Sequence, residues 1–290
     1  MKIKILFSKK KMASKYYLEG LNNVTNIYKY SKNPTINLQL TDICELKNKY
    51  KFTKNNIYQD SAPFLEGKCS KMVRILIGSL SYKNITEIDI DYTRLDSICK
   101  QVNINYTKNW NYNKDGYILI CTSNSTKNGW HNKNVLDLNN IEIILKNIRK
   151  FTNKKIILRL HPSDIKNFEQ YKNHIEYLKK TYEISCDIER KRLKYNLKNI
   201  YCAICDKTSL GPFFIFYGIP VFNFQSNIED SCISKICLSK YELLDNLKID
   251  DLPDRIEYLH FIANQIYTVN EIKNGYMFRR IYPYLLKNIK

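Results

Sequence analysis

The sequence predicts an α/β protein with two domains, of which the C-terminal one is a doubly wound parallel sheet. From residue 117 onward, short apolar runs typical of buried strands alternate with segments whose apolar residues follow helical spacing. Strands separated by single helices imply right-handed crossovers and parallel pairing. A polar, turn-rich stretch at 106–116, YTKNWNYNKDG, separates this region from a less regular N-terminal half. We therefore expect an N-terminal α/β domain at 1–110 and a C-terminal domain with a helical tail at 111–290.

The N-terminal half contains few clear elements. Residues 2–8 predict a first strand, and residues 11–21 predict a short helix that Gly20 closes. The apolar run 73–80 predicts another strand, and 92–102 predicts a helix with one apolar side. The order of the strands does not follow from this pattern.

The C-terminal half has a more regular pattern. The expected elements are, in chain order, strand 117–123, helix 138–151, strand 154–160, a helix after residue 163, short helix 190–197, strand 200–206, short helix 211–218, strand 219–224, helix 253–266 and helix 268–286. Thr268 and Glu271 have the spacing of a capping box at the start of the last helix.

A histidine follows one of the predicted buried strands. The run 156–160 is almost entirely apolar, and Pro162 must end it, so His161 lies at the exit of the strand. Ser163 or Asp164 can cap the helix that follows. The carboxyl edge of a parallel sheet, beside a helix N-terminus, is where such sheets bind anionic ligands. Taken alone, His161 is more simply interpreted as a buried structural histidine.

A second strand exit has the composition of a phosphate-binding turn. Thr208, Ser209 and Gly211 form a tight turn after strand 200–206, and Pro212 opens the next helix. Such a turn offers backbone N–H groups, hydroxyls and the positive end of a helix dipole. An ordinary capped connection has the same composition. If both strands belong to one sheet, His161 and this turn open onto the same edge and can contact one phosphate group.

Net charge and cysteine content restrict the other interpretations. The formal net charge of +19 is compatible with a nucleic-acid partner, but the lysines are spread along the whole chain, which favours a solvated basic surface. No segment is apolar enough to span a bilayer, and the N-terminal MKIKILF is too short and too charged for a signal peptide. Nine cysteines in such a chain indicate reduced thiols and a cytoplasmic protein.

Four cysteines could be arranged as a zinc pattern. Cys202 and Cys205 are followed by Cys232 and Cys237. The first pair lies in an apolar, strand-like run, and the second pair has a different spacing, so buried thiols are the simpler interpretation.

The motifs together resemble GT-B glycosyltransferases and, over residues 115–282, the glycosyltransferase-like proteins of phages and large DNA viruses. RLHPSD resembles the His-Pro motif of GT-B enzymes such as bacterial sialyltransferases, and TSLGPFFIFYGIPVF resembles their donor-phosphate segment. The phage and viral pattern adds a Gly-Trp turn, the stretch IRKFTNKKIILRLHPSD and a tail, which here is PDRIEYLHFIANQIYTVNEIKNGYMFRR. The tail is the most specific part of the resemblance.

The resemblance implies two Rossmann-type domains facing a cleft, with the acceptor on the N-terminal domain and a nucleotide sugar on the C-terminal domain. It implies a hexosyltransferase-like enzyme in which His161 is catalytic. The donor phosphate would be bound by a set of four residues, Arg159, Thr208, Ser209 and Gly211. Pro212-Phe213 replaces the Glu-Ala of general GT-B enzymes, so their ribose-binding carboxylate is missing.

The resemblance leaves other roles open. Arg255, Gln265 and Glu271 belong to the tail motif, and we expect capping and packing roles for them. The acidic candidates for a catalytic base in the N-terminal half are Asp60, Glu66, Asp89 and Asp91. Nothing in the sequence selects among them.

The predicted function is therefore transfer of a sugar from a nucleotide sugar to a hydroxyl of a glycan or other surface polysaccharide. The donor is a substrate, and we expect no cofactor and no metal. Alternatives are a DNA glycosyltransferase acting on hydroxymethylated pyrimidines, a non-catalytic nucleic-acid-binding protein, and a degenerate transferase fold kept as a binding module. The location would be the cytoplasm, which is that of the host if the protein is viral. Donor sugar, acceptor, stereochemical outcome and oligomeric state stay open.

Overall fold

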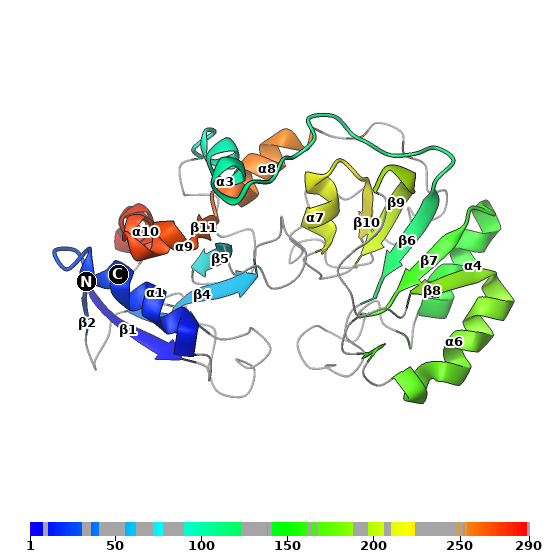
Figure 1. Ribbon diagram of the computed structural model, residues 1–290, viewed down its shortest axis with the longest axis horizontal. Coiled ribbons are helices and arrows are strands. Elements are labelled where there is room, and N and C mark those ends of the chain that lie inside the picture. The colour runs from blue at the N-terminus through cyan, green and yellow to red at the C-terminus, as the bar shows by residue number, and fades with distance from the viewer. Residues whose placement is uncertain are drawn as a thin grey trace. The chain divides into compact units, whose positions relative to one another are not determined.

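The chain forms two units, shown in Figure 1. The computed structural model describes residues 1–7, 11–30, 36–40, 56–61, 72–77, 90–122, 138, 141–161, 164–165, 168–187, 197–205, 210–223, 249, 252 and 254–288. Unit 1 comprises residues 1–105 and 257–290, and unit 2 comprises residues 106–256. In the described part of the chain, no helix is long and apolar enough to cross a bilayer.

Unit 1 contains a mixed sheet whose described strands follow the order β11-β5-β4-β3-β1-β2. The strands are β1 (Lys2–Phe7), β2 (Lys29–Tyr30), β3 (Ile36–Leu40), β4 (Asn56–Ser61), β5 (Met72–Ile77) and β11 (Ile266–Thr268). β1 to β4 pair in parallel, whereas β5 is antiparallel to both β4 and β11. The predicted strands at 2–8 and 73–80 are β1 and β5. β3 and β4 were not predicted, although INLQL of β3 alternates apolar and polar residues as a strand does, and NIYQDS of β4 contains few apolar residues.

The C-terminal tail belongs to unit 1, whereas the sequence prediction placed it in the second domain. β11 pairs with β5, and the helices α9 (Val269–Lys273) and α10 (Tyr276–Asn288) contribute apolar side chains to the core of unit 1. Ile272 and Phe278, for example, lie in one cluster with Ile3 of β1. The tail is assigned to unit 1 for this reason. The expected boundary near residue 110 lies at residue 105.

Gly20 lies inside the first helix, α1 (Lys11–Asn22), and does not close it as predicted. A Cβ atom at this position would lie 1.9 Å from the carbonyl oxygen of Ile272. The glycine therefore allows α1 and α9 to approach each other closely, which explains a residue with poor helix propensity in mid-helix.

We expect Gly20→Ala to destabilise the protein. Alanine favours the helix by about 1 kcal/mol, but its Cβ would overlap a backbone atom, and forced repacking costs about 1–3 kcal/mol or more. Because the overlapping atom belongs to the backbone, the cost should lie at the upper end of this range, and the net loss in urea unfolding should be about 2 kcal/mol. Leu18→Ala is the control, since Leu18 lies in the same helix and is 42% exposed, and it should change stability by less than about 0.5 kcal/mol. Equal stability of Gly20→Ala and wild type would contradict the close packing.

A buried ion pair joins α3 (Arg94–Val102) to the tail. The Arg94 guanidinium binds both carboxylate oxygens of Glu271, with 2.9 Å in each hydrogen bond. Arg94 also donates to the carbonyl oxygens of Ala263 and Ile266. Glu271 completes the predicted capping box, accepting from the Thr268 N–H at 2.8 Å while its own N–H donates to Thr268 Oγ1. The structure thus gives Glu271 the capping and packing role expected from the sequence.

The Glu271 carboxylate should make folding sensitive to acid. Burial alone would raise its pKa, but the hydrogen bonds and charge of Arg94 outweigh burial, and the net effect is a pKa below the ordinary 4.5. A lowered folded-state pKa contributes stability above the unfolded-state value, and this contribution is lost as pH falls through the folded-state value. Between about pH 6 and about pH 3, the free energy of unfolding should therefore fall less steeply in Glu271→Gln than in wild type. If the free energy of unfolding fell equally steeply with pH in Glu271→Gln and in wild type, the Glu271 carboxylate would not be a source of acid sensitivity.

Unit 2 contains a parallel sheet, as predicted, and its described strands follow the order β10-β9-β6-β7-β8, which the sequence did not predict. The strands are β6 (Tyr117–Cys121), β7 (Ile156–Arg159), β8 (Ile184–Asp187), β9 (Ile200–Cys205) and β10 (Val221–Asn223), and the helices are α4 (Ile141–Phe151), α6 (Phe168–Tyr182), α7 (Leu210–Phe216) and the 3-10 helix Leu197–Asn199. β8 was not predicted, because its four residues, ISCD, form no apolar run. The predicted helix at 190–197 lies almost entirely outside the described residues.

The sheet of unit 2 is wound in both directions from its centre. The chain passes from β6 to β7 to β8 on one side of β6, and from β9 to β10 on the other. Right-handed crossovers then place α4 and α6 on one face and α7 on the other. The direction of winding changes between β6 and β9, and the carboxyl ends of these strands are where such sheets bind ligands.

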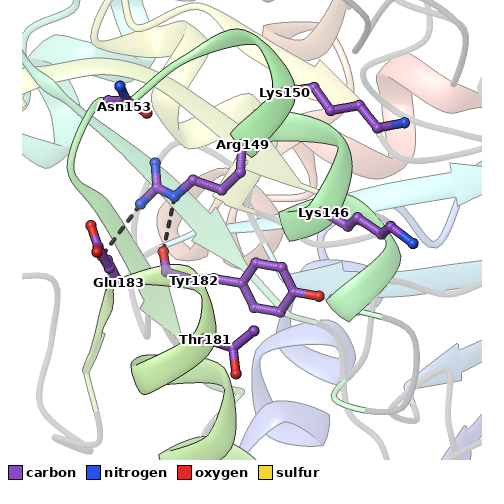
Figure 2. Close-up of a pocket in the computed structure, with 7 residues that line it drawn as sticks. All are labelled: Lys146, Arg149, Lys150, Asn153, Thr181, Tyr182 and Glu183. Carbon is purple, nitrogen blue, oxygen red and sulfur yellow. Dashed lines mark hydrogen bonds between the residues drawn. The ribbon is translucent and has the colours of Figure 1, made fainter.

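Arg149 joins the ends of α4 and α6 (Figure 2). Its guanidinium donates to the carbonyl oxygens of Tyr182 and Glu183 after α6, and to those of Thr152 and Lys154 after α4. The last carbonyl groups of a helix lack partners within the helix, and Arg149 satisfies that of Tyr182 in α6 while it also binds the chain that follows each helix.

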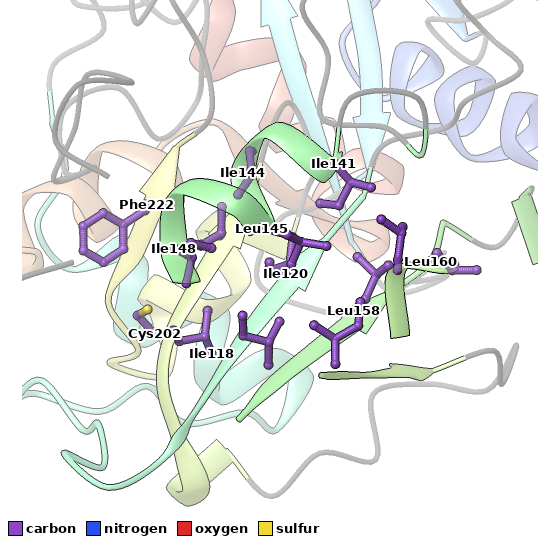
Figure 3. Packing of buried hydrophobic residues seen from close by; sticks show 14 of the residues in the cluster. Ile118, Ile120, Ile141, Ile144, Leu145, Ile148, Leu158, Leu160, Cys202 and Phe222 are labelled. Carbon is purple, nitrogen blue, oxygen red and sulfur yellow. The ribbon is translucent and has the colours of Figure 1, made fainter. Parts of the chain in front are cut away.

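The core of unit 2 fills the space between the sheet and the helices α4 and α6 (Figure 3). From α4, the side chains of Ile144, Leu145 and Ile148 point toward the strands, where Ile118 and Leu158 are fully buried. The helical and strand periodicities seen in the sequence correspond to this one packed layer.

Candidate functional site

The carboxyl ends of three adjacent strands form the edge on which the predicted site lies. Cys121 at the end of β6 is in register with Arg159 of β7, and Ile120 is in register with Ile204 of β9. β6 therefore lies between the two strands whose exits carry the predicted residues. Neighbouring strands are about 4.8 Å apart, so the exits of β7 and β9 are separated by roughly 10 Å.

His161 follows β7 at this edge and is half-buried. Its backbone N–H donates to Thr122 Oγ1 at 3.0 Å, and its carbonyl oxygen accepts from the N–H groups of Asp164 and Ile165 at 2.8 and 3.2 Å. Thr122 directly follows β6, and its own N–H donates to the carbonyl oxygen of Arg159 at 3.0 Å. The backbone of His161 is thus held from both sides.

Arg159 lies on the face of the sheet opposite to α4 and α6. Along β7, Ile156 and Leu158 are buried in the core beneath these helices, and Ile157 and Arg159 are half-buried and alternate with them. The arginine therefore extends from the same face that α7 covers at β9 and β10. Its direction could not be deduced from the sequence.

The second predicted group lies partly outside the described residues. Thr208 and Ser209 belong to that part of the chain. Gly211 is buried and lies in the first turn of α7, because this helix begins at Leu210, one residue earlier than expected. Pro212 is tolerated there, since the first N–H groups of a helix have no acceptor within it.

The end of α7 has the geometry predicted for a terminating glycine. Gly218 has a φ of +78°, and its N–H donates to the carbonyl oxygen of Ile215, while the N–H of Ile219 donates to that of Phe214. This hydrogen-bond pattern ends helices and requires a left-handed residue.

The structure does not support a zinc site at the cysteines of β9. Cys202 and Cys205 are three residues apart in one strand, so their side chains point to opposite faces of the sheet. Burial also raises the pKa of the Cys202 thiol well above its ordinary value, which disfavours the thiolate that binds zinc. The residues with described positions contain no group of three or more potential metal ligands. Cys232 and Cys237 lie outside them.

Two of the four acidic candidates for a catalytic base, Asp60 and Asp91, lie in the described part of the chain. Asp60 lies in β4, in register with Arg74 of β5. Asp91 accepts hydrogen bonds from the N–H and hydroxyl of Thr93 and from Arg280, and these bonds lower its pKa, so it is a weak base with a structural role. Glu66 and Asp89 lie outside the described residues.

Arg255 of the tail motif is buried and organises the chain around α7. It donates to the carbonyl oxygens of Ile215, Phe216, Thr107 and Asn109 and lies over the ring of Trp110. Burial lowers its pKa to about 10, so the guanidinium stays charged at neutral pH. Gln265 has a buried side chain, and its carbonyl oxygen accepts from Ile75. Arg255 has the packing role that we expected, whereas for the Gln265 side chain the structure shows burial alone.

A concave surface of about 470 Å³ lies elsewhere on unit 2, at the ends of α4 and α6 (Figure 2). Its lining includes Lys146, Arg149 and Lys150. The two helices end at the amino ends of β7 and β8, so this surface lies at the edge opposite to His161. The negative ends of both helix dipoles point toward it, and its cations complement these dipoles.

Two residues of this edge were not identified from the sequence. Thr122 is 3% exposed and Asp164 is fully buried. Thr122 could have been found as the first polar residue after the strand 117–121, because such positions lie at the carboxyl edge. Asp164 was considered only as a helix cap.

Comparisons with known proteins give a likeness of fold only. No protein-family model matches the chain, and no curated protein matches it. The solved structures that are similar to this chain include two from Thermosulfurimonas dismutans KpsC. The one named beta Kdo 2,7 transferase is 10% identical, with 96% of this chain and 99% of that chain covered and a TM-score of 0.49. The one named beta Kdo 2,4 transferase is 9% identical, with 94% and 98% covered and a TM-score of 0.46.

At these TM-scores the function has to be argued from the residues themselves. Neither name refers to a phage or a virus, and the resemblance of the sequence to phage and viral proteins stays a prediction.

Proposed function

We propose that the protein is a glycosyltransferase that moves a sugar from a nucleotide-sugar donor to a hydroxyl group of a glycan or other surface polysaccharide. The observation that carries the proposal is the strand order of unit 2. β6 lies between β7 and β9, so His161 and the start of α7 flank the point where the winding of the sheet reverses. The His-Pro and Ser-x-Gly segments, noted from the sequence as resembling GT-B enzymes, begin at these two strand exits.

The proposed chemistry follows from the groups at this edge. The acceptor oxygen attacks the anomeric carbon, the bond from this carbon to the phosphate oxygen breaks, and the electron pair stays on the phosphate. His161 donates a hydrogen bond or proton to this oxygen as charge develops. Arg159, with Thr208, Ser209 and Gly211 at the start of α7, binds the remaining oxygens. These groups would neutralise the leaving phosphate without a metal ion, and the acceptor hydroxyl loses its proton to a base not yet identified.

A nucleic-acid function is the alternative that the net charge of +19 favours. One version is a transferase acting on hydroxymethylated pyrimidines in DNA, and the other is a non-catalytic nucleic-acid-binding protein. The second version predicts salt-sensitive binding of DNA that does not depend on nucleotide sugars or on His161.

A thermal-shift screen distinguishes these functions. The purified protein is heated with UDP, GDP, CMP and their common sugar conjugates, and separately with duplex DNA. A ligand that binds only the folded state raises the melting temperature by mass action. A rise with one nucleotide family supports the donor site and identifies the nucleotide. Stabilisation by DNA alone would contradict the transferase and favour the nucleic-acid-binding protein.

A further inference from the structure

Thr122 occupies an unusual place in the hydrogen-bond ladder between β6 and β7. In a parallel ladder, the N–H of Thr122 bonds to the carbonyl oxygen of Arg159, and the next bond runs from the His161 N–H to the carbonyl oxygen of Thr122. The first bond is present at 3.0 Å. In place of the second, the His161 N–H donates to Thr122 Oγ1 at 3.0 Å. A side-chain oxygen therefore substitutes for a backbone oxygen where the two strands end.

This hydrogen bond fixes the backbone of His161 at the end of β7. The hydroxyl also lies 3.5 Å from the carbonyl oxygen of Arg159, which lets it donate there while it accepts from His161. Pro162 further restricts the backbone of His161 to extended conformations.

Burial separates the roles of the two residues. Thr122 is 3% exposed, whereas His161 is half-buried and reaches the surface of the edge. The hydroxyl of Thr122 donates to the carbonyl oxygen of Arg159 and accepts from the His161 N–H, so its described partners are the two strand ends. Polar groups with this degree of burial are costly to leave unpaired, and the site therefore has one preferred arrangement.

We propose that Thr122 is a positioning residue, whose hydroxyl sets the place of His161 at the carboxyl edge of the sheet and thereby the strength with which the donor phosphate is bound. This inference rests on the proposed function for its effect on nucleotide binding. The first step of the inference, that the Thr122 hydroxyl fixes the backbone of His161 through a hydrogen bond, does not depend on any ligand.

Three variants isolate the hydroxyl. Thr122→Val keeps the shape and removes the hydroxyl, whereas Thr122→Ser keeps the hydroxyl and should restore the wild-type behaviour. Thr152→Val is the matched control, because Thr152 Oγ1 accepts the N–H of Lys154 at 3.1 Å at the opposite edge of the same sheet. The measurements are the exchange rate of the His161 amide by NMR and the Kd of the nucleotide that stabilises the wild-type protein.

In Thr122→Val, we expect the His161 amide to exchange roughly tenfold faster and the Kd to rise at least about tenfold. Thr122→Ser and Thr152→Val should remain close to wild type in both. An unchanged amide rate in Thr122→Val overturns the inference at its first step. A faster exchange rate of the His161 amide with an unchanged Kd overturns the second step, the effect on nucleotide binding, because Thr122 would then have only a structural role. A wild-type protein that binds no nucleotide refutes the proposed function and the effect on binding with it, and the amide rates still tell the two failures apart.

Discussion

His161→Ala is expected to lower the rate of sugar transfer by about 10²- to 10⁴-fold, the usual contribution of a positioned proton donor. The reduction should appear chiefly in kcat, because the hydrogen bond to the leaving phosphate strengthens as charge develops, and loss of its weaker ground-state contribution to donor binding should raise KM as well. The measurement is the turnover of the nucleotide sugar identified by the thermal-shift screen.

The control for this prediction is another histidine of unit 2. His174 lies in α6, where its Nε2 lies 2.9 Å from the carbonyl oxygen of Leu138 and its ring stacks on Tyr177. His174→Ala should leave turnover within about twofold of wild type, since this histidine lies on the helix and not at a strand exit. If both variants retained the same turnover, the role of His161 would be refuted.

Arg94→Met is expected to reduce the free energy of unfolding by about 3–5 kcal/mol. The substitution leaves the Glu271 carboxylate buried without its bidentate partner, and it removes the donors to the carbonyl oxygens of Ala263 and Ile266. Urea unfolding measures the loss.

An exposed ion pair of the same length provides the comparison. Lys179 and Glu176 of α6 also approach to 2.9 Å, but their side chains are 40% and 59% exposed. Lys179→Met should cost less than about 1 kcal/mol, because water and salt screen such pairs. If the two substitutions cost the same, burial would not be the source of the effect.

The fold of unit 2 follows from the sequence to a large extent. Ile118 and Leu158 lie in nearly continuous apolar strands, and Ile144 and Ile148 lie on one face of a helix, so periodicity alone predicts the layers. The exit position of His161 followed from Pro162. The order of the strands, with β6 between β7 and β9, could not be predicted from the sequence, because strand pairing depends on contacts between segments that are distant in sequence.

Unit 1 was less predictable, for physical reasons. β11 consists of Ile266, Tyr267 and Thr268 between two helices, so local pattern alone gives a continuous helical tail. It becomes a strand because β5 offers an edge with which it can pair. Gly20 was interpreted as a helix end because glycine commonly ends helices, whereas its neighbour in space, Ile272, is about 250 residues away in sequence.

The central claim is that the nucleotide binds at the carboxyl edge of the unit 2 sheet, and NMR mapping of the stabilising nucleotide on the wild-type protein tests it most directly. The account predicts that the largest amide shifts occur at Thr122, His161 and Gly211. Shifts concentrated at Lys146, Arg149 and Lys150, on the opposite edge, would contradict it.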